Sequence, residues 1–309
     1  MIKDIREIDK EKGIIRVTTQ DSRFYSQLSV NKETGIPELK WKPSVTWIKS
    51  YYYMSPYLLK WIAEKGIDEA ESIKKEAGIK GDKIHQASEM VDRGEPIKID
   101  QTFLNKNTGI EEELNFEELE AIKSYQEFID EEKPELLAIE LTVFNKEGSA
   151  EEFGGTIDRI FSKGFVREGV RQIWIADIKS SQSVYKDMII QLSAYGHADI
   201  DYKSFGISDE EWINRKLFII QVGYRKNKRL YKVTEVPDRY DLFKTAYKTW
   251  KEENPDAKPK QRDFPLIIQS KHRLRIDLGE TKIKEVSSDT PKVKKPNKLT
   301  KQPNVINAK

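Results

Sequence analysis

Two predicted strands between Phe153 and Lys179 carry two acids and a lysine. The segment FGGTIDRIF carries Asp158, and the apolar segment IWIADIK ends in Asp177 and Lys179. Alternate side chains of an extended strand share a face, so Asp177 and Lys179 point the same way. Asp158 lies 19 positions (177 − 158) before Asp177, which suits neighbouring antiparallel strands joined by a long turn. The two carboxylates together would hold a hard divalent cation.

An acid two positions before a lysine is common in a chain with 34% charged residues. Residues 38–40 and 131–133 show the same spacing with no evident function. What distinguishes Asp177 and Lys179 is their position at the end of an apolar strand, where buried charges need an electrostatic reason. A bound Mg²⁺ would polarise a phosphodiester and help generate hydroxide, and Lys179 would neutralise charge near the attacking water. The pattern therefore favours phosphoryl chemistry.

The next predicted helix, over 184–200, contributes Gln191 and Tyr195. They stand four residues apart and so share one face of the helix. They would hydrogen-bond a phosphate, the substrate backbone or Lys179. The alternative is a partly buried tyrosine beside a surface glutamine.

Histidines are the remaining candidate ligands. His85 and Glu89 share a face of a helix that we expect to begin at Gly81 or Asp82 and to end at Gly94. Taken alone, a histidine is more often structural than functional. His197 and His272 have no acidic partner at helical spacing and are interpreted as structural.

The periodicity of the chain predicts alternating strands and helices around these residues. An aromatic-rich helical stretch over 46–66 follows short N-terminal strands, and its aromatic side chains are predicted mainly to pack, with base stacking on a single strand as the alternative. The strand LAIELTVF carries Glu140. Further predictions are strands over 13–19, 23–30, 38–41, 216–224 and 230–236, and helices over 67–80, 116–134 and 238–254.

Composition limits the chemistry available. The 309 residues include no cysteine, which excludes disulfides, thiolate zinc sites and cysteine-held iron–sulfur clusters. No apolar run approaches the roughly 20 residues of a membrane span, and the first residues lack the apolar stretch of a signal peptide. We therefore expect a cytoplasmic protein with no membrane partner. Beyond residue 280 the chain is predicted to be a disordered basic tail.

Four segments in order, GDKIHQASE, GGTID, ADIKSS and QLSAY, resemble the RecB-like branch of the PD-(D/E)XK nuclease superfamily. The aromatic stretch before them resembles the lead-in of phage-type and mitochondrial single-strand DNA exonucleases of that branch. The resemblance covers about 81–195. It implies an α/β fold with a restriction-endonuclease-like core, in which helices flank a central mixed sheet and a helical, aromatic lead-in precedes it.

The resemblance also implies a role for each residue. His85, Asp158, Asp177 and the backbone carbonyl of Ile178 would bind Mg²⁺ or Mn²⁺. Lys179 would position or activate the water. Roles remain for three further residues: Gln191 and Tyr195 would orient the lysine and the DNA backbone, and Glu140 would add an acidic group. Glu89 is a weaker candidate, for which a surface salt bridge on the helix is the simpler interpretation. Some relatives hold an iron–sulfur cluster through four cysteines, which this chain lacks.

The expected function is a metal-dependent DNA exonuclease acting on single strands or free ends, in the cytoplasm near the nucleoid or in a phage-infected cell. A helicase or recombination protein is a candidate partner. The alternatives are a structure-specific endonuclease and a catalytically silent nucleic-acid-binding module, the latter suggested by basic runs at 225–229 and 271–275. The expected organisation is a lead-in over 1–80, a nuclease core over 81–280 and the tail over 281–309.

Overall fold

The computed structural model describes residues 2–9, 13–19, 22–30, 35, 37–105, 108–166 and 170–259. The chain divides into two units, Met1–Lys260 and Gln261–Lys309. The predicted basic tail, the basic run at 271–275 and His272 all lie outside the described residues. The site residues of the sequence analysis all belong to the first unit.

The elements of the first unit confirm most of the predicted strands and helices and add several short ones. In chain order they are β1 (Ile2–Asp9), β2 (Ile14–Thr19), β3 (Arg23–Val30), β4 (Pro37–Pro43), α1 (Val45–Lys49), α2 (Pro56–Lys65), α3 (Ile67–Asp92), β5 (Thr102–Leu104), β6 (Glu111–Glu113), α4 (Phe116–Glu132), β7 (Glu135–Phe144), β8 (Gly154–Val166), β9 (Val170–Lys179), α5 (Lys186–Gly196), the 3₁₀ helix η1 (Tyr202–Phe205), α6 (Asp209–Ile213), β10 (Lys216–Val222), β11 (Tyr231–Val236) and α7 (Tyr240–Glu253).

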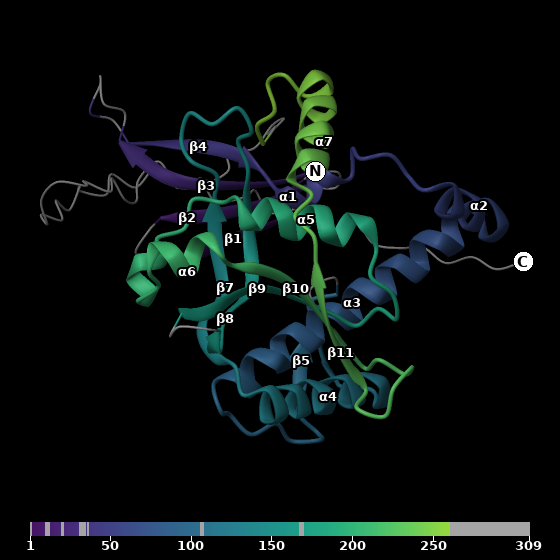
Figure 1. The fold of residues 1–309 in the computed structure, drawn as a ribbon. Helices are drawn as coiled ribbons and strands as arrows, with labels where there is room; N and C mark the ends of the chain where they lie inside the picture. Colours follow the sequence, from purple (N-terminus) through teal and green to yellow (C-terminus); the bar gives the residue numbers. More distant parts are fainter. Residues whose placement is uncertain are drawn as a thin grey trace, which may run out of the picture. The chain divides into compact units, whose positions relative to one another are not determined.

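A five-stranded sheet in the order β11-β10-β9-β8-β7 forms the centre of the unit. Strands β9 and β10 are parallel and are connected through α5, whereas the other neighbours are antiparallel. Helix α5 covers one face of the sheet, and α3 and α4 cover the other (Figure 1). The structure therefore confirms a mixed α/β fold whose central mixed sheet is flanked by helices.

Strand β9 shows why the sheet is covered on both faces. Ile173 and Ile175 pack into the cluster around α5, whereas Trp174, Ala176 and Ile178 pack into the cluster around α3 and α4. A strand buried on both faces has a continuous apolar run because each successive side chain enters a different core. By the same alternation, the next residues on the α5 side are Asp177 and Lys179.

A four-stranded antiparallel meander, β1-β2-β3-β4, precedes the core. It meets the central sheet through a bridge between Ser44 and Gly154, the first residue of β8. A Cβ on Gly154 would lie 2.8 Å from Cβ of Tyr25 in β3, so a glycine is required for this close approach. Lys40 also pairs with Glu147 at 2.7 Å, across the β7–β8 loop.

Two predicted helix boundaries are wrong. The stretch over 46–66 forms two helices, α1 and α2, because Pro56 disfavours helical conformation in the residue before it, while the Ser55 side chain caps the new helix. Conversely, the helix expected to start at Gly81 or Asp82 is continuous with the one before it. Helix α3 runs unbroken for 26 residues, since its neighbouring residues favour a helix and buried Ile84 anchors its second half.

Candidate active site

The candidate site forms where β8 and β9 separate. Their ladder of paired residues ends at Arg159 and Ala176. One residue further, the Asp158 side chain takes the place of a strand partner, because its Oδ2 accepts a hydrogen bond of 2.8 Å from the backbone N–H of Ile178. Asp158 is thereby placed beside the Asp177–Lys179 segment, as their sequence spacing predicts. The hydrogen bond involves the amide of Ile178, whereas the predicted ligand is its carbonyl.

Three side chains from three elements come together here. One potential ligand atom from each of His85, Glu140 and Asp158 lies within 4.8 Å of the other two. Nδ1 of His85 lies 3.8 Å from Oε1 of Glu140 and 3.7 Å from Oδ2 of Asp158. Helix α3, strand β7 and strand β8 thus each supply one donor.

Glu140 lies in an unusual backbone conformation. Its φ of 45° is in the left-handed region, although it sits in the middle of β7. A non-glycine residue held there costs free energy, of order 1–3 kcal/mol, and such residues cluster at functional sites. Strand β7 therefore accepts local strain at the position that directs an acid toward His85.

Asp177 and Lys179 form a close pair beside this group. Their Oδ2 and Nζ atoms are 2.6 Å apart, and Asp177 is only 1% exposed. Burial raises the pKa of Asp177 to about 6; Lys179 opposes the rise, and the nearby Asp158 adds to it. Burial by itself would lower the pKa of Lys179, but Asp177 and Asp158 outweigh it, so that this pKa is raised.

The donors suit a hard divalent cation. Carboxylate oxygens and one imidazole are available, and no thiol exists in the chain. Oδ2 of Asp177 is buried and accepts no hydrogen bond of good geometry from the described residues, although Nζ of Lys179 is nearby. The Lys179 ammonium, 2.6 Å away, supplies the charge that this buried oxygen needs, so the fit to a cation rests on the donors of His85, Glu140 and Asp158. The residues therefore fit a Mg²⁺ or Mn²⁺ ion.

Gln191 takes up a position next to the site, and its neighbours differ from the expected ones. Its Nε2 lies 3.5 Å from Oδ1 of Asp177, while its Oε1 accepts a hydrogen bond of 2.7 Å from Nζ of Lys49. Lys49 also pairs with Asp187 at 3.0 Å. Gln191 therefore links Asp177 to Lys49 of α1 and does not make the predicted contact with Lys179.

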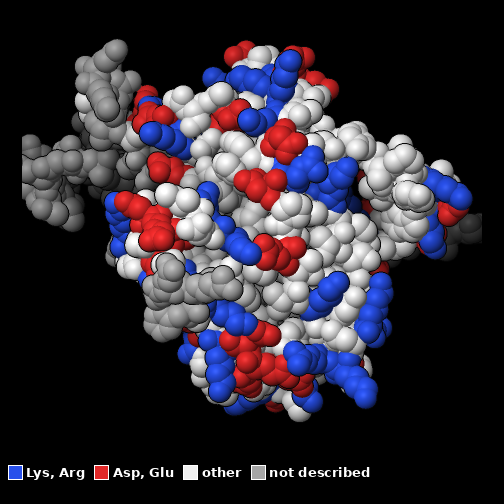
Figure 2. Space-filling view, viewed as in Figure 1, with Lys and Arg blue, Asp and Glu red and all other residues white. Residues whose placement is uncertain are grey.

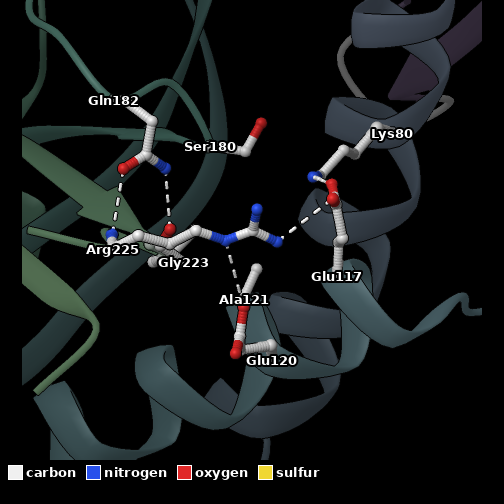
Figure 3. A pocket seen from close by; sticks show the side chains of 9 residues that line it. Lys80, Glu117, Glu120, Ala121, Ser180, Gln182, Gly223 and Arg225 are labelled. Carbon is white, nitrogen blue, oxygen red and sulfur yellow. Dashed lines mark hydrogen bonds and ion pairs between the residues drawn. The ribbon is translucent and has the colours of Figure 1, made fainter. Parts of the chain in front are cut away.

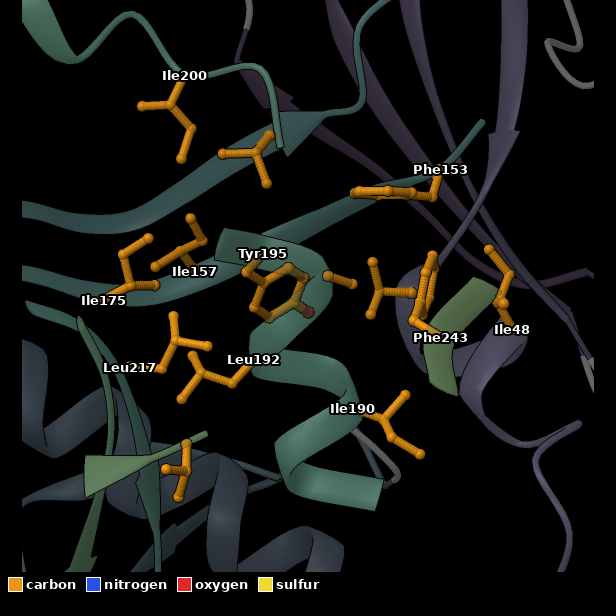
Figure 4. Packing of buried hydrophobic residues seen from close by; sticks show 14 of the residues in the cluster. Ile48, Phe153, Ile157, Ile175, Ile190, Leu192, Tyr195, Ile200, Leu217 and Phe243 are labelled. Atoms are coloured by element: carbon orange, nitrogen blue, oxygen red, sulfur yellow. The ribbon is translucent and has the colours of Figure 1, made fainter. Parts of the chain in front are cut away.

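Tyr195 lies deeper than Gln191. It is 3% exposed and packs in the apolar cluster of Ile157, Ile175 and Leu192 (Figure 4). Burial is the main reason that its pKa is raised well above the usual value. A Cβ on Gly155 would come within 2.5 Å of the tyrosine ring, so the second glycine of the GGTID segment makes room for Tyr195.

A buried ionic network lies next to the candidate ligands. Arg159, next to Asp158 in β8, is fully buried and pairs with Asp92 near the end of α3. Its guanidinium also donates to Ser88 Oγ at 3.0 Å and lies 3.4 Å from Oε1 of Glu140. This network fixes α3, which carries His85, onto the strands that carry the acids, and it orients Glu140.

A cleft of about 350 Å³ opens along α3 next to these groups. Its lining includes His85 and Lys179, together with two glycines of α3, Gly78 and Gly81. A Cβ on either glycine would meet no atom within 4 Å. The helix therefore presents bare backbone to the cleft, beside the candidate ligands.

A second hollow, of about 180 Å³, lies close by and also touches Ser180. Arg225 pairs with Glu117 at 3.1 Å, and Lys80 reaches the same carboxylate (Figure 3). The Gln182 amide accepts from the Arg225 backbone and donates to the carbonyl of Gly223. Arg225 is thus paired internally, so this residue of the basic run at 225–229 is less available to bind an anion than the sequence indicates.

Sequence reasoning missed Lys49, Arg159 and Asp92. The only local signal was an arginine directly after Asp158 in an otherwise apolar strand, where burial requires a partner. Lys49 gave no signal, because its contact with Gln191 spans 142 positions. Two other interpretations can be compared with the structure: Glu89 pairs with Arg93 along α3, as its surface reading expects, and His197 contacts Asp238 at 2.6 Å.

A scan against protein-family models gives no match for this chain, and a search of curated proteins gives none either. Within the described residues, none of the helices is both long and apolar enough to cross a membrane.

Proposed function

We propose that the protein is a metal-dependent deoxyribonuclease with a PD-(D/E)XK core of the RecB-like type, which hydrolyses phosphodiester bonds from single-stranded or free DNA ends. The observation that carries this proposal is the convergence of His85, Glu140 and Asp158 beside the Asp177–Lys179 pair, at the edge of an open cleft. The order of the four sequence segments supports the same reading, as does the mixed sheet, which carries the second and third segments and lies between the helices that carry the first and fourth.

The residues of the site have different proposed roles. His85, Asp158, Asp177 and the Ile178 carbonyl would hold Mg²⁺ or Mn²⁺, which would polarise the phosphate and acidify a bound water. Lys179 reaches the cleft with its ammonium charged, so it can hold the attacking water and offset negative charge on the phosphate.

The residues around this centre set its geometry. Glu140 is a further acid at the centre, while Gln191 keeps Asp177 in place through its contact with Lys49. Tyr195 packs under the strands, where it supports the positions of Asp158 and Asp177 rather than reaching solvent.

An end-labelled DNA digestion tests the proposal. The wild-type chain is expected to cleave with Mg²⁺ or Mn²⁺ and to be inactive with EDTA. Lys179→Ala and Asp177→Ala are expected to lose at least a hundredfold in rate, as is usual when a charge-stabilising group is removed, while retaining DNA affinity. Glu89→Gln is the matched control, because Glu89 shares α3 with His85 but pairs with Arg93.

Two outcomes would contradict the proposal. Full cleavage by Lys179→Ala or Asp177→Ala would refute the site, and DNA binding without metal-dependent cleavage would indicate a silent binding module. Comparing circular with linear single-stranded DNA adds the mode of action, since an exonuclease leaves the closed circle intact and an endonuclease opens it.

A further inference from the structure

The aromatic stretch around α1 and α2 separates into a buried and an exposed part. Trp47 packs edge-on against Phe24 and Trp250, with ring centroids 5.1 and 5.2 Å away. A few residues later the chain leaves the core, and Tyr53 is 65% exposed and Tyr57 86% exposed. Packing accounts for the first part of the stretch but not for Tyr57, and Tyr53 stays mostly exposed although its ring centroid lies 4.4 Å from that of Tyr52.

Helix α2 continues this exposed surface. None of its 10 residues is buried. Its apolar residues Leu58 and Leu59 are exposed, and so is the preceding Met54. The helix stands beside the N-terminal half of α3, away from the central sheet (Figure 1). A group of exposed apolar and aromatic side chains marks a surface that meets another molecule.

A lysine is placed directly over the aromatic rings. Nζ of Lys186 lies 5.7 Å from the ring centre of Tyr52 and 5.6 Å from that of Tyr53, and it donates to the Tyr53 hydroxyl at 3.3 Å. No carboxylate pairs with Lys186 among the described residues. Lysine and arginine side chains gather near uncharged surface on this face of the molecule (Figure 2).

This surface adjoins the catalytic cleft. Lys186 opens α5, and Met188, two residues later, lines the cleft together with His85 and Lys179. On the other side, α2 leads into α3, whose glycines line the same cleft. A chain-like ligand lying over Tyr53 and Lys186 would therefore continue into the candidate active site.

We infer that Tyr53, Tyr57 and Lys186 form an entry surface for an unpaired nucleic-acid strand, whose bases stack on the tyrosines while Lys186 contacts a phosphate. The faces of bases are accessible for stacking on protein rings only when the strand is unpaired. Every base has such a face, so this surface binds without sequence preference. The inference rests on the proposed function and specifies an unpaired strand as the substrate of that site.

Binding of a labelled oligothymidylate in EDTA tests this without any cleavage. Tyr53→Leu and Tyr57→Leu are each expected to weaken binding about tenfold, because they remove a stacking ring but keep apolar bulk. Tyr53→Phe and Tyr57→Phe keep the ring and are expected to bind within about twofold of wild type. Ile213→Ala, an exposed apolar residue on α6, is the control and should not change binding.

A salt titration tests the part played by Lys186. Lys186→Gln is expected to reduce the log–log slope of affinity against salt concentration by about 0.7, which corresponds to one phosphate contact on a single strand. An unchanged slope would show that Lys186 does not contact a phosphate of the bound strand.

Three results would overturn the inference. They are wild-type-like binding by both leucine variants, an equal loss of affinity for blunt duplex DNA, and a change in oligomeric state of the leucine variants at unchanged oligonucleotide affinity. The last would identify the surface as a protein interface. Binding in EDTA does not depend on cleavage. Absence of cleavage in the digestion assay would therefore count against the proposed nuclease activity alone. A wild-type chain that does not bind the oligonucleotide would refute the entry surface.

Discussion

Replacing Gly78 and Gly81 by alanine should change stability and activity in opposite directions: the fold should become more stable, while turnover should fall. Both lie inside α3 and line the cleft, and an added Cβ would touch nothing in the protein at either position. Glycine is among the worst residues for a helix interior, since it loses most conformational freedom on folding. Packing gives no reason for two glycines here, whereas an approaching substrate backbone does.

The size of the effect follows from these facts. Each Gly→Ala change in a helix interior stabilises by about 1 kcal/mol, so that Gly78→Ala/Gly81→Ala together should gain about 2 kcal/mol. For a unit of this size, that corresponds to an increase in Tm of about 4–8 °C. The added methyl groups enter the cleft and displace the substrate, and misplacement by about 1 Å lowers turnover by up to about a hundredfold.

Thermal unfolding and single-strand digestion, measured on the same preparations, provide the assay. Ser72→Ala is the matched control: Ser72 is exposed on the same helix but does not line the cleft, so this change should stabilise slightly and leave turnover unchanged. A double variant that is more stable and fully active would refute the reasoning, because the substrate would then not approach this side of α3.

Two further predictions concern buried charge. Arg159→Met should lower the free energy of unfolding, measured in urea, by about 3–5 kcal/mol, because it leaves the buried Asp92 without its charged partner. The control is Lys65→Met, which breaks an exposed ion pair and should lower the free energy of unfolding by less than about 1 kcal/mol. Equal losses for the two variants would contradict the buried network. Because the folded pKa of Asp177, about 6, lies above the ordinary 3.8, the metal-free fold loses stability as pH rises between these values. Asp177→Asn should therefore abolish this loss, so that its unfolding free energy changes less between pH 4 and 6 than that of the wild type; an unchanged pH dependence would rule out this titration.

Local pattern was sufficient to predict the strands that carry the acids. The alternation of β9 placed Asp177 and Lys179 on one face, and their pair at 2.6 Å confirms it. The separation between Asp158 and Asp177 correctly indicated neighbouring antiparallel strands. These relations depend only on the period of a strand and on a single turn, which the sequence contains directly.

Relations between distant elements were less accessible. His85 lies 73 positions before Asp158, and periodicity can place it on a helix face without showing which sheet edge that face meets. The pairing of Arg159 with Asp92 is likewise a tertiary contact, as is that of Lys49 with Gln191. The continuity of α3 through Gly81 was missed because packing of its second half outweighs the local preference of one glycine.

The junction between Ser44 and Gly154 affects how the first unit would come apart. Backbone pairing links the end of the meander to the first residue of β8, and Tyr25 sits against that residue without room for a side chain. Opening the meander would thus release the beginning of the strand that carries Asp158. We therefore expect amide hydrogens of β3 and β8 to exchange in a single cooperative step, and a fragment starting after residue 44 to lack an ordered start of β8.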